Sequence, residues 1–276
     1  MTTSHSSVGF WSEAAGRWVN DEERVELIGR VPGRIAMDRL GLQPGLRVLD
    51  VGCGLGATTV ELANRTSPGG VAVGVDASPT MLDAARNRTA PPAVKFVHAD
   101  AQRMLLDPAS YDRVFSRFGA MFFDDAIAAF ANLRRGLRTD GRLAIVSWQA
   151  IEHNDWMRLP AAAASDVLDA PVALPQPDRP GPFSLCDPER IRASLDAAGF
   201  HAIDITPHND HVEVPVSDVM AFAAGSMGHG GIRAALRQAD TEQRVLQAIA
   251  DRLLRHAADN GVIRLRRGVH IVVARP

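Results

Sequence analysis

The sequence predicts a doubly wound α/β fold built on a mainly parallel sheet, and three observations support this prediction. Short apolar strands alternate with segments of helical periodicity between residues 43 and 149. The first three of these strands end on Asp50, Asp76 and Asp100. A glycine-rich turn, "GCGLGA", joins the first strand to a helix. Because parallel strands present their carboxyl ends at one edge of the sheet, the three aspartates are expected to line one ligand crevice.

Residues 11–40 are predicted to form short helices before the sheet, because their apolar residues recur at helical spacing. Pro32 suits the first turn of a second helix in this region, where a missing N–H costs nothing. The turn "QPG" then leads into a buried strand, "LRVLDV", which is followed by a helix that begins near Thr58 and Thr59.

The next elements repeat the alternation of strand and helix. After the turn "SPGG", the strand "VAVGVD" ends at Asp76, and Ser78 and Pro79 suit the N-cap and first turn of a helix. The strands "VKFVHAD" and "YDRVFSRF" follow, and then a helix over residues 126–137. A turn in "TDGRLAIVSWQ" leads into a fifth strand, so the order of elements indicates a parallel sheet.

The pattern changes after residue 150. Residues 151–188 are rich in proline, alanine and aspartate, and "APVALPQPDRPGPF" contains too much proline for regular structure. A helix over 188–199, a strand in "HAIDI", two or three helices over 216–260 and a strand in "GVHIVVARP" are predicted beyond it. These changes divide the chain into an N-terminal helical cap (1–40), a core (41–150), a lid insertion (151–190), a continuation of the core (191–214), a helical lid (215–261) and a last core strand (262–276).

The composition is that of an ordinary globular protein, with 46% hydrophobic and 22% charged residues in a chain of 276. The net charge of −2 argues against nucleic acid as the main partner, and the arginines between residues 252 and 267 are expected to form a solvated face. Neither a signal peptide nor a membrane-spanning run is found, so we expect a cytoplasmic protein without a membrane partner. Cys53 and Cys186 show no disulfide framework, and Lys95 as the only lysine is typical of a GC-rich bacterial genome.

The turn after the first strand matches the loops of two kinds of nucleotide site. Gly52, Gly54 and Ala57 match the permissive dinucleotide fingerprint, whereas Asp50, Gly52, Gly54 and Gly56 match the loop that holds S-adenosylmethionine. A dinucleotide would place its pyrophosphate at the start of the helix, beside the carboxylate of Asp50. S-adenosylmethionine has no phosphate; its ammonium suits an acid, and its carboxylate suits glycine amides and a helix terminus. The comparison favours S-adenosylmethionine.

A resemblance to a known family rests on the motifs "VLDVGCGLGATT", "GVDASPTMLDAAR", "VKFVHADAQRM", "YDRVFSRFGAMFF" and "LRTDGRLAIVSW". Together they resemble the class I S-adenosylmethionine-dependent methyltransferases, especially the small-molecule branch of quinone-biosynthesis and natural-product tailoring enzymes. The resemblance implies a seven-stranded Rossmann-like sheet whose last strand is antiparallel, with helical lid insertions. It also implies methyl transfer to an O, N or C nucleophile of a small apolar or aromatic metabolite, with S-adenosylhomocysteine as the second product.

The same resemblance implies roles for individual residues around the cofactor. Asp76 would hold both ribose hydroxyls, Asp100 would accept from the adenine amine, and Ser116 would approach the methionine end through its backbone. The complete set expected to bind the cofactor is Asp50, Gly52, Cys53, Gly54, Asp76, Ala77, Met81, Asp100, Ala101 and Ser116.

The substrate is expected to lie over the sulfonium, under a cover of the N-terminal segment and the insertions, where aromatic faces would attract a cation. Candidate substrate-binding residues are Trp11, Trp18, Phe118, Met121, Phe122, Asn154, Trp156, Met220 and Phe222. His153, which follows the fifth strand, is the first candidate for a general base, and His229 is the second. The spacing of "HNDH" at residues 208–211 is poor for a metal site, so no metal is expected.

Three alternatives stay open at this point. An enzyme of the same fold could use the cofactor for another reaction, such as a cyclisation, because fold does not determine chemistry. An NAD(P)-dependent oxidoreductase is disfavoured by Asp50 and Asp100, and a non-catalytic binding subunit is disfavoured by the elaborate lid. The sequence leaves the acceptor atom and the oligomeric state open, and it is compatible with a homodimer.

Overall fold

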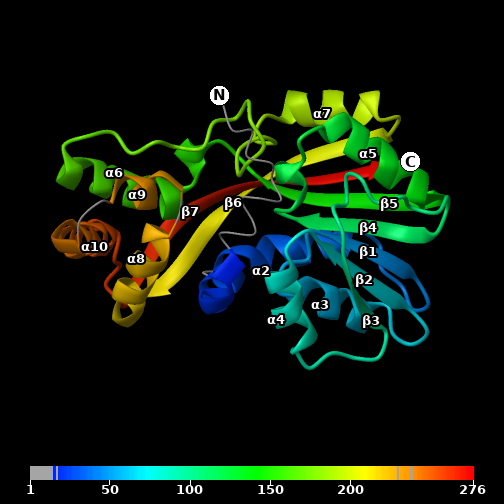
Figure 1. The fold of residues 1–276 in the computed structure, drawn as a ribbon, viewed down its shortest axis with the longest axis horizontal. Coiled ribbons are helices and arrows are strands. Elements are labelled where there is room, and N and C mark those ends of the chain that lie inside the picture. Colours follow the sequence, from blue (N-terminus) through cyan, green and yellow to red (C-terminus); the bar gives the residue numbers. More distant parts are fainter. Residues whose placement is uncertain (1–14, 17, 229, 237–238) are drawn as a thin grey trace.

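A seven-stranded mixed sheet in the order β3-β2-β1-β4-β5-β7-β6 organises the chain (Figure 1). The computed structural model describes residues 15–16, 18–228, 230–236 and 239–276. The strands are β1 (Arg47–Val51), β2 (Val71–Asp76), β3 (Val94–His98), β4 (Tyr111–Arg117), β5 (Leu137–Trp148), β6 (His201–Pro215) and β7 (Val262–Arg275). The first five pair in parallel, and β7 is antiparallel to both β5 and β6. The predicted mainly parallel sheet with an antiparallel last strand is therefore confirmed.

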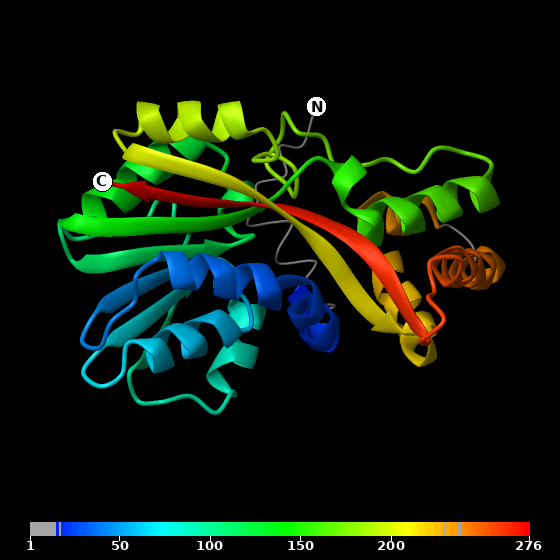
Figure 2. The ribbon, with the colours of Figure 1, turned by 180° about the vertical axis from the view of Figure 1, so that it is seen from behind.

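Helices cover both faces of the parallel strands. The helices α2 (Glu22–Arg39), α3 (Ala57–Arg65) and α4 (Pro79–Arg86) lie on one face, and α5 (Ala126–Gly136) and α7 (Pro188–Ala197) lie on the other (Figures 1 and 2). Residues 48–51 of β1 and 72–75 of β2 are consequently all buried, which explains their continuous apolar character. No helix in the described part of the chain is long and apolar enough to cross a membrane.

The predicted cap of α4 is present and fixes the connection that follows β2. Ser78 Oγ accepts a hydrogen bond from the Met81 N–H at 3.3 Å, and Pro79 is the first helical residue. Such a cap satisfies one of the four N–H groups that a helix start leaves unpaired. Because α4 begins three residues after Asp76, the cap also holds the carboxyl end of β2 in place.

Pro32 does not begin a second helix; it lies inside the single helix α2. A proline within a helix leaves the carbonyl four residues earlier, here that of Ile28, without its usual donor. Arg267 of β7 replaces that donor, because its Nη1 donates to Ile28 O at 2.6 Å while Nε and Nη2 bind the carboxylate of Asp210 on β6. The prediction of a helix break at this proline is therefore wrong, because a contact from the other end of the chain satisfies the backbone.

The strands β6 and β7 continue well beyond the parallel sheet as a long antiparallel pair, which the predicted strands "HAIDI" and "GVHIVVARP" cover only in part. Four lid helices gather at its outer end: α6 (Asp155–Leu168), α8 (Val219–Met227), α9 (Gly230–Ala235) and α10 (Ala239–Leu254) (Figure 1). α6 packs against α10. It lies in a region where no helix is predicted, whereas the proline-rich residues 170–183 form neither helix nor strand, as expected.

Candidate functional site

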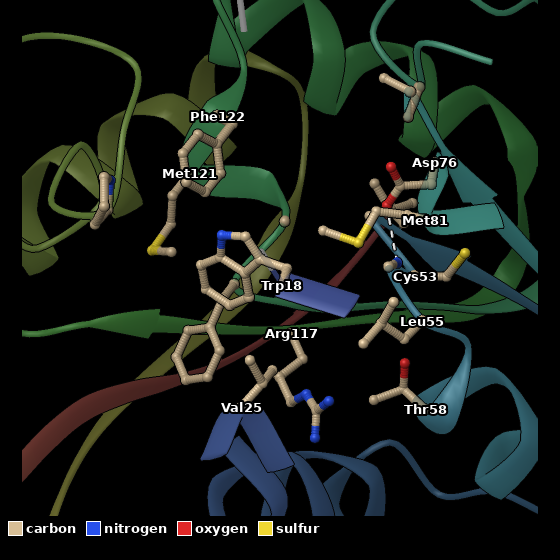
Figure 3. Close-up of a pocket in the computed structure, with 18 of the residues that line it drawn as sticks. Trp18, Val25, Cys53, Leu55, Thr58, Asp76, Met81, Arg117, Met121 and Phe122 are labelled. Atoms are coloured by element: carbon tan, nitrogen blue, oxygen red, sulfur yellow. Dashed lines mark hydrogen bonds between the residues drawn. The ribbon is translucent and has the colours of Figure 1, made fainter. Parts of the chain in front are cut away.

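A cavity opens where the carboxyl ends of the parallel strands meet, as the positions of the strand-end aspartates predict (Figure 3). One part, here called the glycine-loop half, is lined by residues within 51–58, 75–81 and 99–102. The other part, here called the aromatic half, is lined by residues within 18–28 and 117–123, by Trp148, by residues 156–157 and by Pro182. The two halves form one continuous space.

The glycine loop after β1 adopts a conformation that only glycine tolerates at two positions. Gly52 has φ +68°, and a Cβ atom there would lie 2.7 Å from the Cα of Gly119. Gly56, with φ +81°, would place a Cβ atom 2.6 Å from the ring of Phe96. The first contact is between two backbones, so the loop is fixed tightly against the turn that follows β4.

Asp76 at the end of β2 lines the cavity and holds the loop at the same time. Its Oδ2 accepts from the Gly54 N–H at 2.8 Å, and its Oδ1 accepts from the Ser78 N–H at 2.9 Å. Burial raises the pKa of this carboxyl, although the backbone N–H groups oppose the rise. Each carboxylate oxygen has two lone pairs, so both can accept one further hydrogen bond from a ligand.

Most residues expected at the cofactor meet in the glycine-loop half. The members of this set that line the cavity are Gly52, Cys53, Gly54, Asp76, Ala77, Met81, Asp100 and Ala101. Asp100 is held by its neighbour, because its Oδ1 accepts from the Gln102 N–H at 3.0 Å. The thiol of Cys53 is buried and free, and burial raises its pKa.

Asp50 and Ser116 are not among the residues that line the cavity, whereas the resemblance implies Asp50 around the methionine part of the cofactor and the backbone of Ser116 near it. Asp50 lies behind the glycine loop, where its Oδ2 accepts from the hydroxyls of Thr58 and Thr59 at 2.7 Å each and its Oδ1 has no hydrogen-bond partner. Burial raises the pKa of Asp50 to about 6. The hydroxyl of Ser116 is turned to the backbone, donating to Val51 O at 2.9 Å. Both side chains position the loop from behind.

A row of aromatic rings forms one wall of the aromatic half. Phe118 stacks on Trp148 with ring centroids 3.9 Å apart and planes within 8°, and Trp148 contacts Trp156 at 4.9 Å. The backbone of Phe118 has φ +62°, an unusual value for a residue with a side chain. Trp18, Met121 and Phe122 also line this half, so five of the predicted substrate-binding residues are brought together here.

The remaining candidates for substrate binding and proton transfer lie elsewhere. Asn154 is fully buried and holds β7, because its Nδ2 donates to Gly268 O and its Oδ1 accepts from the Gly268 N–H. Met220 and Phe222 of α8 are not in the cavity wall, and neither is the exposed His153. None of these four side chains lies in the cavity wall, so the structure does not bring them together with the predicted cofactor residues. Trp11 and His229 lie outside the described residues.

Sequence reasoning missed an ion pair and one aromatic residue of the aromatic half. Glu26 of α2 and Arg117 at the end of β4 line the cavity and bind each other, with Nη2 and Oε1 2.5 Å apart. Trp148 is the last residue of β5. Because ligands bind at the carboxyl ends of parallel strands, its position in the sequence could have indicated that it lines the site. Nothing in the spacing of Glu26 and Arg117 indicates their pairing, because they are 91 residues apart.

Comparison with known proteins places this architecture in a family. Residues 48–141 match the family model described as a methyltransferase domain. The matched segment is a methyltransferase domain, and the strand order of the sheet agrees with the class I S-adenosylmethionine-dependent fold that the motifs resemble. The cofactor of this domain is S-adenosylmethionine. The demethylmenaquinone methyltransferase of Staphylococcus aureus is 34% identical over 106 residues, which are 38% of this chain and 44% of that enzyme. The chain thus matches less than half the length of this curated relative.

Solved structures extend the similarity of the methyltransferase fold to nearly the whole chain. A putative methyltransferase from an antibiotic biosynthesis pathway of Anabaena variabilis has a TM-score of 0.60 at 19% identity, covering 90% of this chain and 97% of that one. The phosphoethanolamine N-methyltransferase 2 of Haemonchus contortus, in complex with S-adenosylhomocysteine, has a TM-score of 0.59 at 17% identity, covering 98% and 60%. At these identities the similarity establishes the fold and leaves the acceptor open.

Proposed function

We propose that this protein transfers the methyl group of S-adenosylmethionine to an O, N or C nucleophile of a small planar metabolite, apolar or aromatic in character. One observation carries the proposal: a single cavity joins the glycine loop and Asp76 to the stacked rings of Phe118 and Trp148. A methyl donor and a flat acceptor would lie in one continuous space, which holds the two reactants in line.

The glycine-loop half fits the cofactor chemically. Asp76 would accept from the two ribose hydroxyls, and Asp100 from the exocyclic amine of adenine, since both carboxylates line the cavity. Ala77 and Met81 would flank the adenine ring, and the backbone of Ala101 would offer an amide. When bound, S-adenosylmethionine supplies an activated methyl group on a sulfonium.

The aromatic half supports a flat acceptor. Stacked and edge-to-face ring pairs each contribute about 0.5–1.5 kcal/mol beyond the area that they bury. Trp148 lies between Phe118 and Trp156, so the wall presents a largely aromatic surface. The demethylmenaquinone methyltransferase similarity is consistent with such an acceptor, because a quinone is a planar ring system.

The cavity wall contains few groups that could remove a proton from the acceptor. Among its described lining residues there is no histidine, lysine or tyrosine. His153 is exposed outside the cavity, which leaves it without direct access to the acceptor. We therefore propose an acceptor that ionises readily, such as a phenol or hydroquinone, whose nucleophile needs no strong base.

The test is mass spectrometry of the purified protein incubated with deuteromethyl-labelled S-adenosylmethionine and a panel of phenols, hydroquinones and aromatic amines. We expect S-adenosylhomocysteine and a labelled product to form in equal amounts. Asp76→Ala should abolish product formation, whereas Asp83→Ala, at a side chain that is 73% exposed on α4, should leave it unchanged. Conversion of an acceptor with S-adenosylmethionine left intact would instead support the cyclisation alternative, and binding of NAD alone would contradict the proposal.

We further propose a cytoplasmic enzyme of bacterial secondary metabolism that acts on a free metabolite. The arginines near the C-terminus support only the choice of a free metabolite over a nucleic acid, because carboxylates already pair with them. The pairs are Arg252–Asp166, Arg264–Glu213, Arg266–Asp155 and Arg267–Asp210. A chain that bound nucleic acid here would need unpaired cations for the phosphates.

A further inference from the structure

The ion pair between Glu26 and Arg117 is a charged feature in the wall of a mostly apolar chamber. The arginine uses two nitrogens, with Nη2 2.5 Å from Oε1 and Nη1 3.3 Å from Oε2. Both side chains are largely buried, at 12% exposed for Arg117 and 14% for Glu26, yet both line the cavity. Withdrawing two charges from water is costly, so a buried pair beside a ligand cavity calls for a functional explanation.

Helix α2 is shaped to receive the side chain of Arg117. A Cβ atom at Gly29 would lie 3.3 Å from the guanidinium carbon, and one at Gly33 would lie 2.9 Å from Cδ. These glycines follow Glu26 by three and seven residues and so share its face of the helix. Glycine destabilises a helix interior, and here it leaves a groove in which the arginine reaches the carboxylate.

The pair lies next to the glycine loop. Figure 3 shows Arg117 between Val25 of α2 on one side and Leu55 of the glycine loop and Thr58 of α3 on the other. Burial and the threonine hydroxyls dominate the pKa of Asp50, but the charge of Arg117 also lowers it. The guanidinium therefore acts electrostatically on the residue behind the loop, from the cavity side of it.

The cofactor of the proposed function ends in an amino acid, which carries an ammonium and a carboxylate. Asp50 is buried behind the loop, so the carboxylate that this part of the cavity wall offers to an ammonium is that of Glu26. We propose that Glu26 and Arg117 together recognise this zwitterionic end, Glu26 binding the ammonium and Arg117 the carboxylate. The inference rests on the proposed use of S-adenosylmethionine.

The hydrogen-bonding capacity of the pair supports this assignment. A guanidinium has five N–H donors and a carboxylate about four acceptor positions, so Arg117 keeps free donors and Glu26 keeps a free acceptor position, even with the exposed Arg30 3.8 Å from its Oε2. The other cavity-lining arginine, Arg24, is turned to α2 and α8, where it binds Asp21 and the Gly225 carbonyl. Asp76 ends β2 and Asp100 follows β3 by two residues, both on the adenosine side of the proposed site.

The test compares two ligands that differ only at this end of the molecule. S-adenosylhomocysteine carries the amino acid, whereas 5′-methylthioadenosine carries a methyl group in its place. Both are titrated calorimetrically into the wild type, Glu26→Gln, Arg117→Met and the control Glu23→Gln, which alters an exposed carboxylate on the same helix. We expect Glu26→Gln and Arg117→Met to weaken S-adenosylhomocysteine binding at least tenfold and to leave methylthioadenosine affinity within twofold.

The outcomes separate this inference from the proposed function. Equal weakening of both ligands, or no weakening of either, would overturn the role of the pair while the wild type still bound the cofactor product. An unchanged S-adenosylhomocysteine affinity with a raised KM for the methyl acceptor would assign the pair to the acceptor instead. A wild type that binds neither ligand would overturn the proposed function and the inference with it. Arg117→Met removes a buried charge, so thermal unfolding of each variant verifies that it is folded. If Arg117→Met does not fold, Glu26→Gln, which preserves the shape of the side chain, still tests the inference.

Discussion

The two halves of the cavity are built in different ways. The glycine-loop half comes from three short segments that each follow a parallel strand, and backbone contacts such as that between Gly52 and Gly119 fix its shape. The aromatic half takes side chains from α2, from the turn after β4, from β5 and from α6. A site that is formed by backbone at strand ends can be predicted from the spacing of residues within one segment of the sequence. A site that is formed by side chains from distant segments cannot be predicted in this way.

The largest expected effect is that of Gly52→Ala in the glycine-loop half. The new Cβ atom would meet the Gly119 Cα at 2.7 Å, and the residue would keep φ +68°. We expect a loss of about 3 kcal/mol in the free energy of unfolding, from backbone strain and overpacking. Urea denaturation measures this loss, and calorimetry should detect no binding of S-adenosylhomocysteine.

Gly54→Ala is the matched control for this change. Its φ is +53°, but no atom lies within 4 Å of the Cβ position, so only the strain of about 1 kcal/mol applies. Equal losses for the two variants would show that the backbone contact with the turn after β4 contributes nothing.

A second large effect is expected far from the loop, at Arg267. Replacement by methionine would leave the Ile28 carbonyl without a donor opposite Pro32 and would remove the partner of Asp210. We expect Arg267→Met to lower the free energy of unfolding by about 3 kcal/mol. Arg264→Met on the same strand, where the arginine is 53% exposed, should change it by less than about 0.5 kcal/mol. A small effect at both positions would argue that α2 needs no support from β7.

The pH dependence of stability tests the buried carboxyl behind the loop. Because burial raises the pKa of Asp50 from 3.8 to about 6, the folded protein keeps a proton that the unfolded chain releases over this range. The free energy of unfolding contributed by Asp50 therefore falls as the pH rises from 4 to 6. Asparagine does not ionise, so the stability of Asp50→Asn relative to the wild type should rise by about 2 kcal/mol between pH 4 and pH 7. Denaturation of both proteins across this range, with Asp83→Asn as the exposed control, measures the difference.

The smallest expected effect lies in the aromatic half. Trp148→Leu removes the ring that Phe118 stacks on and shortens the flat wall. We expect the KM for an aromatic acceptor to rise about fivefold, which corresponds to about 1 kcal/mol of stacking, with S-adenosylhomocysteine affinity unchanged within twofold. Met220→Leu, outside the cavity on an exposed part of α8, should change neither quantity. If Trp148→Leu weakened both ligands equally, the division into two halves would be contradicted.

The sequence alone determined the parallel core and most of the residues that line the glycine-loop half of the cavity. Strands such as that ending in Asp76 are bounded by turn and cap residues, and the cap at Ser78 is a contact within a few residues. Gly52 and Gly56 are required by the backbone conformation of one turn. Signals of this kind depend on neighbours in the chain, and for that reason they can be recognised without a structure.

Only the tertiary structure decided which polar groups face the cavity. Asp50 turned out to lie behind the loop and Asn154 under β7, while Glu26 and Arg117 met across 91 residues of sequence. Pro32 remained inside a helix because Arg267, 235 residues later in the chain, replaced the missing donor. In each case the outcome depends on burial and on a partner that is distant in sequence. The spacing of residues along the chain indicates neither the burial of a side chain nor a partner that is distant in sequence, because both arise only when the chain folds.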